Sequence, residues 1–158
     1  MKPITISDQE LIKKLFRIGA IGEQSEKAEI HPLLAAYLAD KGILNDGEKI
    51  LKAAKKGDKL AEDKIAVIKH LWSHGYITRV SLEGKEEYLR VHRKGIRPGE
   101  DRTQYLVKVV QENWKPKFTE ILENIAFAGK LRKELVLAYL EGKEKQVRFI
   151  RIGRSSFD

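Results

Sequence analysis

The sequence predicts an α/β (α+β) fold, in which a small helix-rich N-terminal domain, residues 1–75, precedes a C-terminal domain, residues 76–158, built on β-strands. Apolar residues in the first part recur three and four residues apart, which is the spacing of an amphipathic helix. Short runs rich in Val, Tyr, Leu and Ile dominate the second part and are separated by turn residues, as in strands. A length of 158 residues suffices for one medium-sized domain or two small ones.

The first predicted helix begins at a capping box. Ser7 is expected to be its N-cap, and the Glu10 side chain is expected to reach back to the Ser7 amide. Gly19 and Gly22 are expected to end the helix. Its apolar face consists of Leu11, Ile12, Leu15 and Phe16.

Three further helices are predicted before the spacing of apolar residues changes from that of helices to that of strands. Pro32 suits the first turn of the second helix, and Gly42 closes it. A third helix is expected over roughly residues 46–56 and stops at Gly57. The fourth ends before Gly75, and its apolar positions are Ala61, Ile65, Ile68 and Trp72.

The second part is predicted to run strand, strand, strand, helix, strand, strand. The helix follows Pro116 and ends at Gly129. Its apolar stripe consists of Phe118, Ile121, Leu122 and Ile125. The fourth strand is apolar at nearly every position, which suits a strand buried on both faces. The expected strands are Tyr76–Val80, Tyr88–Arg93, Gln104–Val110, Leu135–Leu140 and Val147–Ile152.

Charge favours a polyanionic partner, and the chain carries no sign of a membrane segment. The net charge is +8, and residues 76–158 hold 18 basic and 12 acidic side chains. Such an excess attracts polyanions, so a polyanion-binding surface is expected in the C-terminal part. No apolar run reaches the roughly 18–20 residues that span a bilayer. The N-terminal segment MKPITISDQE lacks a signal peptide's apolar region, so a cytoplasmic protein is expected.

Residue types narrow the chemistry further. The absence of cysteine excludes disulfides, thiolate catalysis and Cys-based zinc sites. One Met and 34% charged residues resemble the composition of a thermophile's protein. His70 and His74 have a spacing that could hold a metal on a helix, but no third ligand is evident, so neither metal nor cofactor is expected. Trp72 and Trp114 are expected in the core or a domain interface.

Four segments follow one another in a characteristic order: HLWSHGYITRV, YLRVHRKG, TQYLVKVV and AGKLRKELVLAYLEGKEKQVRFIRI. The first resembles a helix that ends at an aromatic-rich first strand, and the next two resemble paired strands of the same family. The fourth resembles that family's C-terminal strands. Together they resemble the archaeal tRNA-splicing endonucleases over about residues 33–155.

The resemblance implies a small N-terminal α/β domain and a restriction-endonuclease-like C-terminal domain with a mixed β-sheet. It also implies a four-subunit assembly that excises introns at bulge–helix–bulge sites in precursor tRNA. In that family the reaction is metal-free and leaves a 2′,3′-cyclic phosphate and a 5′-hydroxyl. A base, an acid and a cation carry it, and the family's Tyr, His and Lys correspond to these roles.

The chain matches the family's lysine and departs from the other two positions. Lys133 stands at the lysine position, although a solvated charge at a strand start would look the same. Arg102 occupies the histidine position, and a guanidinium with a pKa above about 12 is a poor proton donor. Glu83 lies nearest the tyrosine position. The chain therefore resembles the family's non-catalytic structural subunits, which pair with catalytic subunits in a heterotetramer (α2β2).

The resemblance also assigns surfaces. The turn at residues 140–144 matches an acidic loop that docks into a basic pocket of an opposing subunit, although an ordinary hairpin turn would read alike. The last strand is apolar enough to pair with a counterpart in a partner. The expected interface residues are Glu141, Glu144, Val147, Phe149, Ile150 and Ile152. The candidate RNA-binding residues are Arg93, Lys94, Arg97, Arg102, Arg148, Arg151 and Arg154, which could also be solvated charges.

Three hypotheses remain open. The first is a structural, catalytically deficient subunit that works with a catalytic subunit on precursor tRNA and could form a homodimer in isolation. The second is an active nuclease with displaced groups, using Lys133 with His92 or Tyr88, which lie on one strand face. His92 is otherwise expected to be a structural histidine. The third is a basic nucleic-acid-binding module with a winged hairpin. The buried strand Leu135–Leu140 and the helix after Pro116 do not fit that fold well.

Overall fold

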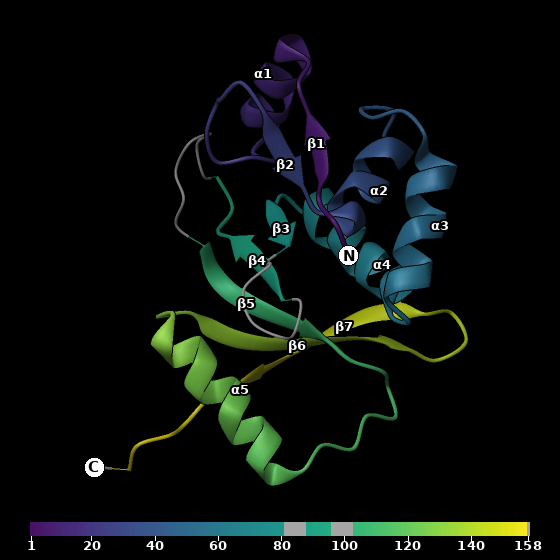
Figure 1. The fold of residues 1–158 in the computed structure, drawn as a ribbon. Coiled ribbons are helices and arrows are strands. Elements are labelled where there is room, and N and C mark those ends of the chain that lie inside the picture. Colours follow the sequence, from purple (N-terminus) through teal and green to yellow (C-terminus); the bar gives the residue numbers. More distant parts are fainter. Residues whose placement is uncertain (81–87, 96–102, 158) are drawn as a thin grey trace.

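The computed structural model describes residues 1–80, 88–95 and 103–157, and in this part of the chain a helical layer covers one face of a β-sheet (Figure 1). The N-terminal elements are β1 (Ile4–Ile6), α1 (Gln9–Ile18), β2 (Ala28–Ile30), α2 (Pro32–Asp40), α3 (Gly47–Gly57) and α4 (Ala61–Ser73). The remaining elements are β3 (Thr78–Val80), β4 (Leu89–His92), β5 (Thr103–Val109), α5 (Phe118–Lys130), β6 (Glu134–Glu141) and β7 (Gln146–Ile152).

The sheet has five strands in the order β3-β4-β5-β6-β7. All neighbours are antiparallel except β5 and β6, which run parallel. A parallel pair needs a crossover connection, and α5 lies within it on the sheet face opposite the N-terminal helices (Figure 1). The predicted α/β fold class with a mixed sheet and its strand–helix order are confirmed.

The N-terminal part contains a two-stranded antiparallel sheet of β1 and β2 that the residue pattern did not predict. Each strand is three residues long, too short to show alternation. The four predicted helices are confirmed. The predicted cap of the first helix is wrong by one residue, because the side chain of Asp8 and not Ser7 accepts hydrogen bonds from the Glu10 and Leu11 amides.

Helix ends follow the predicted glycines in four cases, including α3, which runs to Gly57, and depart from them in the fifth. Gly19, Gly42 and Gly75 all adopt positive φ one or two residues after the end of a helix, as the sequence predicts. The prediction that Gly129 ends α5 is wrong. The helix runs to Lys130, and Arg132 takes the left-handed position with φ 55°.

One large apolar cluster joins the helices to the sheet. It contains Leu15, Leu33 and Ile68 from helices together with Val91 and Val107 from strands, so the core crosses the predicted boundary at residue 75. That domain boundary stays a prediction. A smaller cluster lies under α5 and consists of Tyr88, Leu106, Ala128 and Leu135.

The predicted apolar stripe of α5 is only partly covered. Phe118 is 72% exposed, and the buried positions of α5 are Asn124 and Ala128. β6 is buried from Leu135 to Ala138, as predicted, and half-buried thereafter. No helix among the described residues is both long and apolar enough to span a bilayer.

Candidate functional site

Three of the candidate residues, Glu83, Arg97 and Arg102, lie outside the described residues. Their assignment rests on the sequence. The remaining candidates fall into two groups, one around the start of β5 and one on β7 and the turn before it.

Lys133 is placed by the way α5 ends. The Lys133 amide donates to the Ala128 carbonyl oxygen at 2.9 Å, and the Arg132 amide donates to the Gly129 carbonyl oxygen at 3.0 Å. This pair of bonds is a Schellman motif with Arg132 in the left-handed position. The chain therefore turns directly from α5 into β6, and Lys133 is fixed one residue before the strand.

From that position the Lys133 side chain reaches the first residue of β5. Its Nζ donates to the Thr103 carbonyl oxygen at 3.1 Å and to Thr103 Oγ1. Arg93 Nε donates to Gln104 Oε1, on the next residue of the same strand. Two cations distant in the sequence thus meet the two residues that directly follow Arg102 in the chain.

Tyr88 and His92 are both buried. The Tyr88 hydroxyl donates to Asn124 Oδ1 at 2.6 Å, and Tyr88 is 6% exposed. His92 is fully buried, and its amide donates to the Ile77 carbonyl oxygen at 2.9 Å. Neither side chain lies where an RNA 2′-hydroxyl could meet it without a rearrangement of the core.

The acidic turn and β7 are connected by ion pairs within the chain. Arg148 Nε donates to Glu141 Oε2 at 2.7 Å, and Arg151 Nη2 lies 3.5 Å from Glu134 Oε2. The amide of Gly142 donates to Glu112 Oε2 at 3.2 Å. The charge of Glu141 is therefore partly offset by Arg148 on the neighbouring strand, while Glu144 and Arg154 are exposed.

Among the strands that the structure describes, β7 lies at the edge of the sheet, with only β6 beside it. Phe149 is 38% exposed and Ile150 is 47% exposed, on opposite faces of the strand. An edge with exposed apolar side chains invites pairing with another chain. The structure therefore places the predicted interface residues on one free edge and the turn that leads into it.

His70 and His74 stack on one another, with ring centroids 4.2 Å apart. Burial lowers the pKa of His70, and the neighbouring His74 lowers it further. His74 Nδ1 lies 2.8 Å from the His70 carbonyl oxygen. Among the described residues, no group of three or more His, Cys, Asp and Glu side chains gathers that could hold a metal ion.

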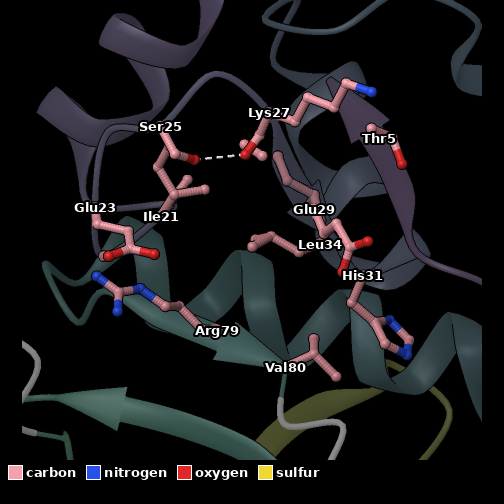
Figure 2. A pocket seen from close by; sticks show the side chains of 14 residues that line it. Thr5, Ile21, Glu23, Ser25, Lys27, Glu29, His31, Leu34, Arg79 and Val80 are labelled. Atoms are coloured by element: carbon pink, nitrogen blue, oxygen red, sulfur yellow. Dashed lines mark hydrogen bonds between the residues drawn. The ribbon is translucent and has the colours of Figure 1, made fainter. Parts of the chain in front are cut away.

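A cavity of about 510 Å³ lies where the N-terminal part meets β3 (Figure 2). Arg79 crosses its edge and donates through Nε to the Gly19 carbonyl oxygen at 3.0 Å. In Figure 2 the Glu23 carboxylate points toward the Arg79 guanidinium, while Lys27 and Glu29 lie on the opposite wall. Because acids and bases balance on its walls, this cavity favours no polyanion.

The residue pattern gave no function to Tyr76 and Tyr105, which together with His70, Phe149 and Lys94 line a cavity at the end of α4. Strand pairing brings residues from separate strands to this cavity. Val91 of β4, for example, pairs with Tyr105 of β5, and both line it. Alternation within each strand was visible in the sequence, but the register between strands was not.

Comparison with known proteins identifies a family. Residues 61–149, more than half of the chain, match the family described as "tRNA intron endonuclease, catalytic C-terminal domain". The match includes β3 to β6 and most of β7, and therefore Lys133 and the turn before β7.

Several relatives are named tRNA-splicing endonuclease. That of Thermococcus kodakarensis is 29% identical over 144 residues, which are 85% of this chain and 83% of the relative. That of Pyrococcus furiosus is 34% identical over 115 residues, 68% of this chain and 65% of the relative. That of Methanothermobacter thermautotrophicus is 24% identical over 148 residues, 89% and 86% of the two chains. These relatives come from thermophilic archaea, which agrees with the thermophile-like composition.

Proposed function

The chain belongs to the tRNA intron endonuclease family, and from this premise we propose that it is the structural, catalytically deficient subunit of a heterotetrameric tRNA-splicing endonuclease. The enzyme excises introns at bulge–helix–bulge sites in precursor tRNA. This chain stabilises a catalytic partner in an α2β2 assembly and helps to hold the RNA. Without the partner it cuts nothing.

One observation carries the proposal: of the family's three reacting side chains, only the lysine has a counterpart, Lys133. Cleavage needs a group that accepts the 2′-hydroxyl proton and a group that protonates the leaving 5′-oxygen. Glu83 and Arg102 stand in the sequence at those two positions. A guanidinium can hold a phosphate but does not release a proton near neutral pH.

The contacts of Lys133 support a structural role for this residue. Its ammonium group donates to Thr103 and so ties the start of β6 to the start of β5. A lysine engaged with the backbone at 3.1 Å stabilises the sheet.

The free edge of β7 supports the assembly. Its exposed apolar side chains, Phe149 and Ile150, flank a strand that can extend the sheet by pairing with a partner's strand. Glu141 and Glu144 precede this strand in the turn that the family resemblance assigns to docking. The cations Arg148, Arg151 and Arg154 are exposed on or after β7 and provide charge for RNA phosphates.

The alternative of an active nuclease with displaced groups is disfavoured by burial. His92 is fully buried, and the Tyr88 hydroxyl is occupied by Asn124. Neither side chain can serve as acid or base for an RNA that binds at the surface of this fold.

The test is cleavage of an intron-containing tRNA precursor by the purified full chain. It is run alone, then with a catalytic family subunit from the same source, with an intronless tRNA as the control substrate. The proposal expects no cleavage by the chain alone and cleavage with the partner. An Arg102→Ala chain should also support cleavage with the partner, because Arg102 is no proton donor. Cleavage by the chain alone would refute the proposal.

A further inference from the structure

A cavity of about 400 Å³ opens between the C-terminal end of α4 and the sheet. Its floor consists of buried aliphatic side chains, among them Leu71 of α4 and Val107 and Val136 of the sheet. Val107 pairs with Val136, and Val136 pairs with Arg151, so three adjacent strands supply one continuous row. This volume is within the range of small-ligand pockets, which is roughly 300–1,000 Å³.

Five aromatic rings surround this floor. His70 stacks on His74 with ring centroids 4.2 Å apart and lies 5.6 Å from the ring of Phe149. Tyr76 and Tyr105 line the same cavity and are half-buried, while Phe149 and His74 are exposed. The rings are therefore fixed on one side by packing and open to solvent on the other.

Two cations lie at the rim. Lys94 Nζ lies 5.1 Å from the centroid of the Tyr76 ring, and the lysine is exposed. The Arg151 side chain is 68% exposed and forms an ion pair with Glu134 at 3.5 Å. No carboxylate occurs among the described residues that line the cavity.

Rings beside cations are the chemistry of nucleotide recognition. Bases that are not paired stack on aromatic side chains, and Lys or Arg holds the phosphate that follows. An acidic peptide side chain would use the cations but leave the rings and the apolar floor without a contact. The combination therefore favours a ligand with a flat apolar ring and an anionic group.

We propose that this cavity binds one unpaired nucleotide of the RNA, with its base against Tyr76, Tyr105 and Phe149 and its phosphate at Lys94 and Arg151. The identity of the ligand rests on the proposed function, which makes RNA the polyanion that this chain meets. The site is compatible with pairing of β7 to a partner strand. Pairing uses the outward backbone groups of β7, whereas the Phe149 side chain lies toward α4 beside His70.

The probe is a fluorescein-labelled single-stranded oligoribonucleotide of about eight nucleotides, titrated with the full chain at fixed salt. Tyr105→Leu removes one ring of the site, and Tyr139→Leu is the control, a half-buried tyrosine of β6 outside the cavity. Lys94→Gln removes one rim cation, with exposed Lys117→Gln as its control. Tyr105→Leu should weaken binding about tenfold, and Lys94→Gln several-fold, while both controls remain within about twofold.

A second measurement needs no variant. Photocrosslinking of the same oligonucleotide carrying 5-iodouridine, followed by peptide mass spectrometry, should label Tyr76, Tyr105 or Phe149. Crosslinks confined to other surfaces, or equal loss of binding in Tyr105→Leu and Tyr139→Leu, would overturn the proposal. RNA binding that is unchanged in Tyr105→Leu, with weaker association to the catalytic subunit, would assign the cavity to a partner protein instead.

These outcomes are separate from those of the proposed function. A chain that supports cleavage with its partner but shows no crosslink in the cavity keeps the structural-subunit role and loses this site. A chain that binds the oligonucleotide in the cavity but supports no cleavage with any partner keeps the site and loses the role.

Discussion

The Lys133 ammonium group donates to the carbonyl oxygen of Thr103 at 3.1 Å and to its hydroxyl oxygen, and so joins the residue before β6 to the first residue of the parallel strand β5. A Schellman motif fixes the backbone of Lys133, and β5 fixes that of Thr103. The fold therefore holds in place the lysine that the family resemblance predicts to stand at the reacting position.

Replacing Lys133 with Met should destabilise the chain. A hydrogen bond from a charged group is worth about 1.5–3 kcal/mol, and partial exposure places Lys133→Met near the low end, at about 1–2 kcal/mol. Urea unfolding monitored by circular dichroism measures this. The exposed Lys130→Met is the control and should stay within about 0.5 kcal/mol. Equal effects of the two substitutions would show that the contact contributes nothing, and a double-mutant cycle with Thr103→Val isolates the hydroxyl.

Arg132→Gly should stabilise the chain. Arg132 has φ 55°, a region that costs a residue with a Cβ about 1–2 kcal/mol. Glycine removes that cost but makes the unfolded chain more flexible, which leaves a net gain of about 0.5–1 kcal/mol. Thermal unfolding should show a midpoint about 1–4 °C higher. Lys130→Gly, two residues earlier at the last position of α5, should lower the midpoint. If both variants lower it equally, the left-handed position is not strained.

Gly19→Ala should destabilise the chain strongly. Gly19 has φ 87°, and an added Cβ would lie 2.7 Å from Cδ1 of Ile77. Backbone strain of about 1–2 kcal/mol and overpacking of about 1–3 kcal/mol together predict a loss of roughly 2–5 kcal/mol. Gly42→Ala is the matched control, with φ 75° and no atom within 4 Å, and should cost only about 1–2 kcal/mol. Adding Ile77→Val should recover part of the Gly19→Ala loss, and failure to do so would contradict the steric explanation.

These helix ends show what the sequence could predict and what it could not. Glycine marks the left-handed residue after three helices, and there the sequence located the end. After α5 the left-handed residue is Arg132. Arginine is not a residue type that predicts a helix end, so the prediction fell on the nearby Gly129 instead. Hydrophobic spacing predicted each helix and the five strands of the main sheet. Strands β1 and β2 were missed because three residues show no period.

The candidate sites were likewise predictable from the sequence only in part. Family resemblance located Lys133, but only the fold shows that its ammonium group meets Thr103, 30 positions away in the chain. The aromatic cavity depends on the register of four strands, which pairs Val91 with Tyr105 and Val136 with Arg151. Register is fixed by long-range packing, so no local pattern in the sequence contains it.

Stability should fall in mild acid because of His70. Burial, and then His74, lower the pKa of His70 in the folded state below its ordinary value of about 6.5. The unfolded chain therefore takes up the proton first, so stability is full above about pH 6.5 and decreases as pH falls until His70 is protonated in the folded state too. The thermal midpoint measured at about pH 7.5 and pH 5 should drop less in His70→Gln than in the natural chain. An equal drop would exclude His70 as the cause.

Ile150→Lys should weaken assembly with the catalytic subunit and leave the fold intact. Ile150 is 47% exposed on the free edge strand β7, so a lysine there costs little in the isolated chain but is unfavourable in an apolar interface. Association measured by analytical ultracentrifugation should weaken at least tenfold, or about 1.4 kcal/mol, while the thermal midpoint of the isolated chain moves by only a few degrees. Phe118→Lys is the matched control, since Phe118 is a larger and more exposed apolar side chain on α5, away from β7. It should leave association within about twofold. The reverse result, with Phe118→Lys disrupting assembly and Ile150→Lys silent, would move the subunit interface from the sheet edge to α5.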